Sequence, residues 1–205
     1  MRHAFLNICF KATLVLAVAA AALVLYSWIV AAVEPSSGVR PLLGAEGVRW
    51  FFGTFAANVS GPPLAWLVLC SMAAGIFAGS GLGGAAASLF RGRSLGVRSS
   101  RALAASAATL VLIVCVVVLL AFVPRAVLLG VGGGLWPGPF SSAVVPMAAF
   151  ALAAVSALYG LAGGTYAGLA DVYNHMCRGL SALAAVVPVY VMAVELYYMF
   201  VFVFD

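Results

Sequence analysis

The sequence has very few charged residues. Asp, Glu, Lys and Arg make up 7% of the 205 residues, hydrophobic residues make up 66%, and the mean hydropathy is +1.20. A soluble domain carries charge on about a quarter of its residues. The composition therefore argues against a soluble enzyme or a disordered tail, and it predicts an all-α protein of the lipid bilayer. The net charge of +5 rests on 10 Lys and Arg, which is too sparse for a nucleic-acid-binding surface.

Residue types that support catalysis or metal binding are equally scarce. The two histidines, His3 and His175, fall at the edges of apolar runs. No HExxH, GxSxG or CxxC motif occurs, and no carboxylates are paired. We therefore expect no enzymatic activity, no catalytic residues, no metal site and no cofactor. The cysteines are expected to act as small buried hydrophobic residues, at positions Cys9, Cys70, Cys115 and Cys177.

Long apolar runs dominate the chain. A membrane-spanning helix needs about 20 apolar residues, and the first run is too long for a cleaved secretory signal. Pro124 is expected to end the third span, and Pro188 is expected to kink the fifth. We predict a single integral membrane domain over residues 1–205, with five transmembrane helices at about 12–33, 64–90, 102–123, 142–167 and 179–204.

The segment 45–58, between the first two spans, has a helical pattern of its own. Its apolar residues recur at helical spacing, which places them on one face. A short amphipathic helix lying in the membrane interface is the natural interpretation. The residues of this face are Val48, Phe51, Phe52 and Phe55.

The basic residues indicate how the spans are oriented. Loops on the cytoplasmic side retain Lys and Arg. If the amino terminus is cytoplasmic, the basic residues Arg40, Arg49 and Arg125 lie outside, and the carboxyl terminus lies outside too. The larger group then lies inside: Arg2, Lys11, Arg91, Arg93, Arg98, Arg101 and Arg178.

Glu195 is the one charged residue well inside an apolar span. A carboxylate at the membrane centre costs about 2.5–3.5 kcal/mol on insertion scales, so such a residue is a candidate for substrate binding or ion coupling. The alternative is a solvated Glu near the outer end of the helix, because the residue is about 15 Å from the end of the span. Both interpretations stay open at this point.

Glycines recur four residues apart in the second and fourth spans. Small residues at this spacing allow helix backbones to approach closely. They predict either packing within the chain or an interface between subunits. The residues are Gly75, Gly79, Gly83, Gly160, Gly164 and Gly168.

Two stretches, 41–90 and 139–202, resemble the p-aminobenzoyl-glutamate transporter (AbgT) family of bacterial inner-membrane proteins. The resemblance covers somewhat over half of the chain and rests on scattered identities in the right order. The first stretch contributes Leu43-x-x-Glu46-Gly47-Val48-Arg49, Asn58, Pro63-Leu64, Gly75 and Ser80-Gly81-Leu82. The second contributes Pro139-Phe140-x-Ser142, Val145-Pro146, Tyr159-Gly160, Gly164-Thr165 and Asp171-Val172.

The resemblance implies a dimeric transporter with nine spans and two re-entrant hairpins, which moves p-aminobenzoyl-glutamate or sulfonamide-like aromatic acids. This sequence departs from that pattern. Between Phe90 and Ala102 it has only an Arg-rich loop, where the family has two further spans and the first hairpin. It also carries no counterpart of the second hairpin. Ala78 stands where an acidic residue is usual, and Glu195 where Gln is usual.

The resemblance therefore implies a reduced relative in the bacterial inner membrane. One hypothesis is a transporter, or a transporter component, for aromatic acids, with Glu195 in ion coupling and with a second copy or a partner subunit supplying the polar pathway. The alternatives are a non-transporting scaffold or assembly subunit, and an inactive remnant. The expected partners are the lipid bilayer and a second copy of the chain or another transporter subunit.

Overall fold

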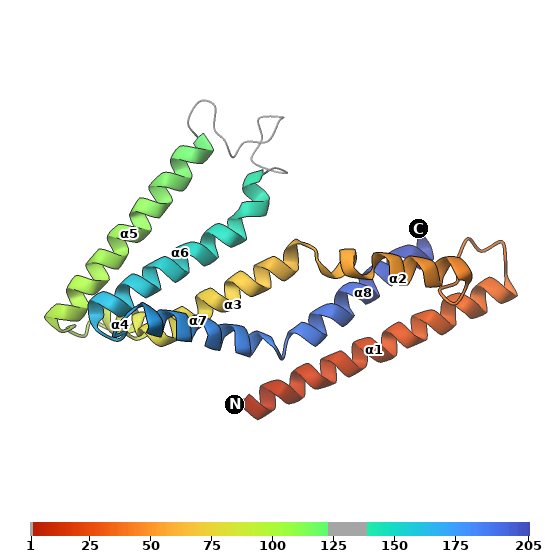
Figure 1. Ribbon diagram of the computed structural model, residues 1–205, viewed down its shortest axis with the longest axis horizontal. Coiled ribbons are helices and arrows are strands. Elements are labelled where there is room, and N and C mark those ends of the chain that lie inside the picture. Colours follow the sequence, from red (N-terminus) through yellow and green to blue (C-terminus); the bar gives the residue numbers. More distant parts are fainter. Residues whose placement is uncertain (1, 123–138) are drawn as a thin grey trace. The chain divides into compact units, whose positions relative to one another are not determined.

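The computed structural model describes residues 2–122 and 139–205 (Figure 1). The predictions for Pro124 and Arg125 fall outside these residues. Every regular element in the described part of the chain is a helix. The helices are α1 Arg2–Val33, α2 Ala45–Val59, α3 Pro62–Ser80, α4 Leu82–Phe90, α5 Val97–Phe122, α6 Pro139–Gly163, α7 Leu169–Leu183 and α8 Val187–Phe204.

Within the described ranges, 5 helical stretches are long and apolar enough to cross a membrane. The prediction of an all-α membrane protein with about five spans is confirmed at this level. The boundaries differ from those expected. The stretches run over His3–Val33, Ala45–Ser80, Val97–Leu120, Phe140–Gly163 and Val187–Phe204. The second of these stretches comprises both α2 and α3.

The second predicted span, 64–90, is wrong as a single helix. Gly81 separates α3 from α4 and has a φ of +79°, a left-handed conformation that glycine adopts without the steric cost of a side chain. The hydroxyl oxygen of Ser80 accepts a hydrogen bond from the N–H of Leu82 at 3.1 Å, which helps to begin α4. The helix also starts earlier than expected, with Pro62 in its first turn.

The fourth and fifth spans also differ from the prediction. The fourth ends at Gly163, because Gly164 has a φ of +81° and turns the chain out of α6. The expected kink at Pro188 is wrong, since the chain breaks between α7 and α8 and Pro188 lies in the first turn of α8. A proline there costs little, because the N–H it lacks would have no helical partner. A proline does lie inside α6, at Pro146.

The contacts divide the chain into two compact units, which we describe separately. Unit 1 comprises Met1–Ala65 with Leu183–Asp205, and unit 2 comprises Trp66–Ala182. The expectation of a single membrane domain over residues 1–205 stays a prediction.

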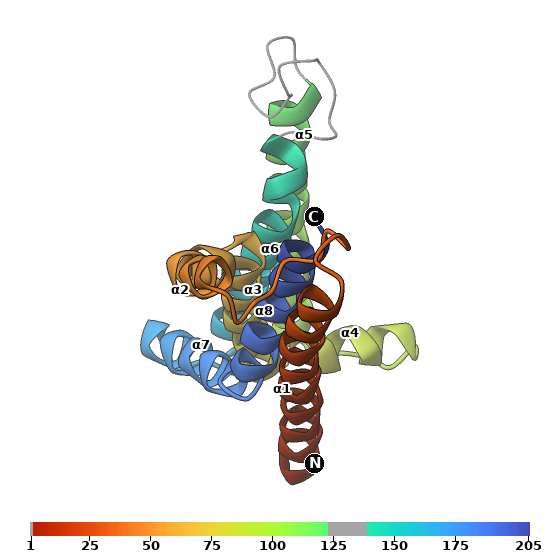
Figure 2. The same cartoon turned by 90° about the vertical axis from the view of Figure 1, so that its right-hand side faces the viewer.

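In unit 1, α8 packs against α1 and α2 (Figures 1 and 2). Its buried cluster joins Leu42, in the loop after α1, to Met199, Phe202 and Val203 of α8. Two hydrogen bonds hold this loop in place. The backbone N–H of Leu42 donates to the Ser27 hydroxyl at 3.2 Å, and the N–H of Arg40 donates to the carbonyl of Val203 at 3.1 Å.

In unit 2, α5 and α6 lie side by side, and α4 contacts both of them. Their shared core contains Ala85, Ala102 and Tyr159, one residue from each of the three helices. The remaining helices, α3 and α7, approach each other through Gly75 and Gly179. Unit 2 therefore combines a long apolar helix pair with a close helix crossing.

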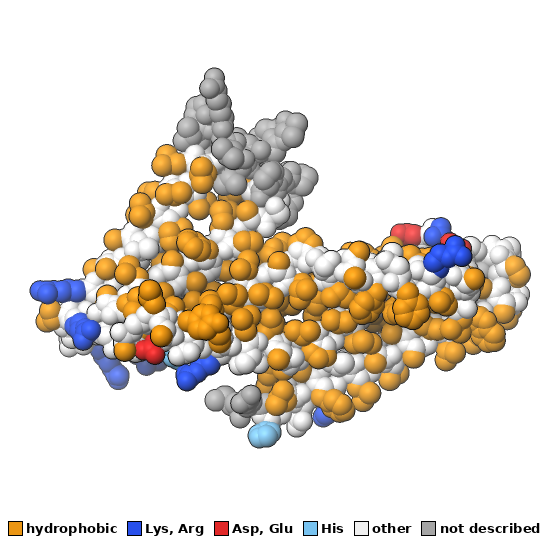
Figure 3. Space-filling view, in the orientation of Figure 1, with side chains coloured by type: hydrophobic (Ala, Val, Ile, Leu, Met, Phe, Trp, Pro, Cys, Tyr) orange, Lys and Arg blue, Asp and Glu red, His pale blue; other side chains and the backbone are white. Residues whose placement is uncertain are grey.

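Large apolar side chains cover the outer surfaces of the helices (Figure 3). On α5, for example, Val111 is 61% exposed and Leu112 is 64% exposed. Soluble monomers rarely expose contiguous apolar surface on this scale. In water such exposure carries a hydrophobic free-energy cost. In lipid this cost disappears, because acyl chains are as apolar as these side chains.

Candidate functional site

The helix predicted at 45–58 is present as α2, over Ala45–Val59. Its apolar face, Val48, Phe51, Phe52 and Phe55, contributes to a pocket shared with α1 and α8. Gly47 lets α2 approach the preceding loop, because a Cβ at this position would lie 2.6 Å from the Cα of Leu42. The apolar face thus has partners within unit 1, while the expected location in the membrane interface stays a prediction.

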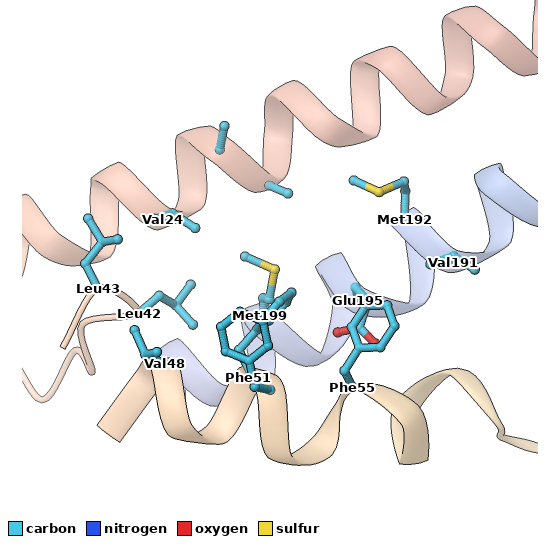
Figure 4. Close-up of a pocket in the computed structure, with 13 residues that line it drawn as sticks. Val24, Leu42, Leu43, Val48, Phe51, Phe55, Val191, Met192, Glu195 and Met199 are labelled. Atoms are coloured by element: carbon cyan, nitrogen blue, oxygen red, sulfur yellow. The ribbon is translucent and has the colours of Figure 1, made fainter. Parts of the chain in front are cut away.

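We call this cavity the apolar pocket, and its volume is about 390 Å³ (Figure 4). All of its lining residues are Ala, Val, Leu, Phe or Met, except for one glutamate. The aromatic rings come from α2, and two flexible thioethers, Met192 and Met199, come from α8. The volume falls within the range of small-molecule sites, which is about 300–1,000 Å³.

Glu195 is the polar residue of the apolar pocket, and it is only 4% exposed. Its Oε2 accepts a hydrogen bond from Nδ2 of Asn58 at 3.5 Å. Its Oε1 is buried and has no hydrogen-bond partner in the part of the chain that the structure describes. This burial argues against a solvated glutamate at the helix end, while the depth of Glu195 in a membrane stays a prediction. A buried polar atom without a partner costs about 1–3 kcal/mol, which makes the site a candidate for a ligand that supplies one.

Asn58 was not expected to contact Glu195, because the two residues are far apart in the sequence. The structure brings them together where the end of α2 packs on α8. Tyr190 supports the same junction, since its hydroxyl donates to the carbonyl of Val59 at 3.0 Å. The sequence contained one indication of this pair. Asn58 is among the residues that carry the family resemblance, and Glu195 stands where Gln is usual in that family.

A second cavity in unit 1, the arginine pocket, has a volume of about 600 Å³. Trp50 and Phe202 lie in its wall, and their rings stack with centroids 4.5 Å apart. Arg40 lies over the Phe202 ring at 5.8 Å and donates to the backbone oxygen of Asp205 at 3.5 Å. The full lining is Arg40, Glu46, Arg49, Trp50, Asn58, Tyr198, Val201, Phe202 and Asp205.

The arginine pocket combines two guanidinium groups with flat aromatic surfaces. Guanidinium groups bind carboxylates through two parallel N–H donors, and aromatic faces bind other rings. Glu46 and Asp205 line the same pocket, so a bound anion would compete with these two acidic groups. Asn58 belongs to this pocket and donates to Glu195 of the apolar pocket, so it links the two linings.

The glycines of α3 pack within the chain. A Cβ on Gly75 would lie 2.7 Å from the backbone nitrogen of Gly179, and a Cβ on Gly79 would collide with the ring of His175. Both glycines therefore face α7, which favours packing within the chain over a subunit interface. Gly83 does not extend their face, because the break at Gly81 puts it on α4, where its nearest neighbour is Phe77 at 3.1 Å.

The glycines of the fourth span do not form one helical face, and this expectation is wrong. Gly160 lies in α6 and faces the ring of Tyr166, whereas Gly164 lies beyond the helix end and contacts the Arg98 guanidinium. Gly168 has no atom within 4 Å of its ideal Cβ position. The spacing of four residues had assumed a continuous helix, which ends at Gly163.

Among the residues that the structure describes, no three His, Cys, Asp or Glu side chains gather as metal ligands. The cysteines are free; Cys70 and Cys115 are exposed, while Cys9 and Cys177 are half-buried. The expectation that the four cysteines are buried is therefore wrong for Cys70 and Cys115, which lie on outward faces of apolar helices. The absence of catalytic, metal and cofactor sites stays a prediction.

Comparisons with protein-family models, with curated proteins and with solved structures found no match. The described residues define the class of the protein, an all-α, multi-pass membrane protein whose unit 1 contains the apolar pocket and the arginine pocket.

Proposed function

We propose that this chain is a component of a membrane transporter for aromatic acids, of the p-aminobenzoyl-glutamate kind that the resemblance to the AbgT family implies. One observation carries the proposal. Arg49 and Asn58, which belong to the motifs of that resemblance, line one pocket together with Arg40 and the stacked rings of Trp50 and Phe202.

The proposed ligand has two chemical parts, and the arginine pocket has a surface for each. Arg40 and Arg49 bind the carboxylates, because guanidinium groups pair with carboxylates through charge-assisted hydrogen bonds. Trp50 and Phe202 receive the aromatic ring, since ring pairs favour offset-stacked contact. Glu46 and Asp205 compete with the ligand for the two guanidinium groups and so keep the binding affinity moderate. A moderate affinity suits a transport site, which must also release its ligand.

Glu195 acts in ion coupling. It is a buried carboxyl within a membrane helix, and its partner Asn58 also lines the arginine pocket. A ligand in the arginine pocket that moves Asn58 would therefore change the hydrogen bond that Asn58 donates to Glu195. Transport sites are usually built from interrupted helices, so a second copy of the chain, as in a dimer, or a partner subunit supplies the polar pathway.

Binding to the purified chain tests this function. We expect saturable binding of radiolabelled p-aminobenzoyl-glutamate to the full chain in lipid nanodiscs. Arg49→Gln should weaken the binding about tenfold, because it removes a charge-assisted hydrogen bond. The matched control is Arg93→Gln, which removes the same charge in the loop after α4. An absence of saturable binding, or an equal effect of both substitutions, would refute the proposal and favour a scaffold or an inactive remnant.

Flux measurements test the role of Glu195. In proteoliposomes, Glu195→Gln should keep binding but abolish the dependence of uptake on an imposed ion gradient. Glu34→Gln, which changes an exposed carboxylate after α1, should leave that dependence intact. If the two variants respond alike to the gradient, Glu195 has no coupling role.

The proposed location is the bacterial inner membrane, with the amino terminus in the cytoplasm and the carboxyl terminus outside. The distribution of basic residues supports this orientation through the positive-inside rule. Phosphatase and fluorescent-protein fusions at the two termini test it. Two termini in the same compartment would contradict both the orientation and an odd number of crossings.

A further inference from the structure

We propose that the apolar pocket is a binding site for a protonated aromatic amine, whose ammonium group pairs with Glu195. The site is separate from the arginine pocket, and the proposal does not depend on transport of aromatic acids. It goes further than ion coupling, because it assigns an organic cation to the carboxyl and names the walls that hold the rest of the ligand.

The first support is the unpaired oxygen. Glu195 is 4% exposed, and Asn58 engages only its Oε2. Oε1 lies buried without a hydrogen-bond partner in the described part of the chain, although the side chain lines a cavity of about 390 Å³. A ligand with an N–H group would satisfy this oxygen, and a positive charge on that ligand would offset the burial of a carboxylate.

The second support is the chemistry of the walls. The rings of Phe51, Phe52 and Phe55 and the thioethers of Met192 and Met199 line the same pocket as Glu195. Figure 4 shows the Phe55 ring beside the Glu195 carboxyl group. Aromatic faces attract cations and stack with rings, and methionine adapts its shape and makes favourable contacts with aromatic edges. The walls therefore suit the aromatic part of the ligand, and Glu195 suits the amine.

Charge complementarity distinguishes this ligand from the other possible occupants. A lipid acyl chain would fill the apolar volume but would leave Oε1 without a donor. An aromatic anion would meet a carboxyl group and no basic residue, since the lining contains no Lys, Arg or His. An aromatic ammonium ion suits the apolar volume, and its N–H groups can pair with Oε1 once the Glu195 side chain rotates toward the cavity that it lines.

The experiment measures binding of 2-phenylethylamine to the full chain in nanodiscs of neutral lipid, with empty nanodiscs as the blank. Two probes of similar shape accompany it: 2-phenylethanol, which has no charge, and 3-phenylpropionate, which has the opposite charge. We expect saturable binding of the amine, at least about tenfold weaker binding of the alcohol, and no binding of the acid.

Two pairs of variants locate the binding. Glu195→Gln should weaken amine binding about tenfold or more while Glu34→Gln does not, because only the first carboxyl lines the pocket. Ala21→Phe should block the pocket from α1 without altering the carboxyl. Its control is Ala22→Phe, at an adjacent exposed position outside the lining.

Each result decides for or against the proposal. Loss of binding in Glu195→Gln and Ala21→Phe, with both controls intact, supports it. Equal binding of the amine and the alcohol would mean that the pocket takes any apolar molecule, including a lipid chain, and would overturn it. Amine binding that survives Glu195→Gln, or that is lost equally in Ala22→Phe, would overturn it as well. Failure of p-aminobenzoyl-glutamate to bind would leave these outcomes unaffected.

Discussion

The crossing of α3 and α7 offers a sharp test of the structure, through the substitution Gly75→Ala. An ideal Cβ on Gly75 would lie 2.7 Å from the backbone nitrogen of Gly179 and 2.8 Å from its Cα. Carbon atoms pack at about 3.5–4.0 Å, so the two helices would have to separate by roughly 1 Å. The obstructing atoms belong to backbone, so no side chain can rotate away to relieve the contact.

The expected cost follows from two opposing effects. Overpacking of this kind costs about 1–3 kcal/mol, and it also removes close contacts along the crossing. Alanine in place of glycine in a helix returns about 0.8–1.0 kcal/mol through helix propensity. We therefore expect Gly75→Ala to destabilise unit 2 by up to about 2 kcal/mol, and Gly75→Leu to destabilise it further.

The assay is unfolding by SDS in mixed micelles, with the alkylation rate of the half-buried Cys177 as a local measure of opening at α7. Gly84→Ala is the matched control, because this helical glycine has no atom within 4 Å of its ideal Cβ position. It should be neutral or stabilising. The double substitution of Gly75 and Gly179 should cost less than the sum of the single ones, because the two residues obstruct each other. Equal midpoints for Gly75→Ala and Gly84→Ala would refute the close crossing.

Three further predictions concern buried polar groups. Tyr166→Phe should destabilise unit 2 by about 1–2 kcal/mol in the same assay, because the Tyr166 hydroxyl donates to the carbonyl of Ile76 at 2.5 Å and its loss leaves a buried carbonyl unpaired; an unchanged midpoint would contradict this bond. Burial raises the pKa of the Tyr166 phenol above its usual value of about 10. The contribution of the neutral phenol to stability is therefore complete below about pH 10 and is lost as the pH rises through the folded-state pKa. An ultraviolet titration should show a late-ionising phenol that is missing from the titration of Tyr166→Phe. Ser27→Ala should cost unit 1 about 1 kcal/mol, because the Ser27 hydroxyl accepts from the N–H of Leu42, whereas the exposed Ser37→Ala should have no effect; equal effects would exclude that role.

Much of the local structure follows from the amino-acid pattern. The helix at 45–58 was predicted from apolar residues at helical spacing, and it is present almost unchanged as α2. Over residues 2–122 and 139–205, the number of apolar helical stretches long enough to cross a membrane also matches, because a run of such residues in lipid has to pair its backbone groups within itself.

The helix breaks were harder to predict. Gly81 and Gly164 adopt left-handed conformations that end helices, yet each lies within a continuous apolar run. Glycine is tolerated inside membrane helices, so its presence alone did not distinguish a packing contact from a break. The same ambiguity made Gly160, Gly164 and Gly168 look like one face, although α6 ends before the last two.

The candidate site shows the same division between sequence and structure. Glu195 could be selected from the sequence, because a lone carboxyl in an apolar span has a cost that must be offset. Its pairing with Asn58, its unpaired Oε1 and the rings around it depend on how α2 folds against α8 and α1.

The sequence by itself determined that the chain is helical and apolar enough for a membrane, because backbone pairing and hydrophobicity act over one run of residues at a time. Only the tertiary structure decided which glycines meet a neighbouring helix and which carboxyl oxygen is left without a donor. These outcomes depend on distances between segments that are far apart along the chain, such as Asn58 and Glu195, and residue spacing within a single helix carries no information about those distances.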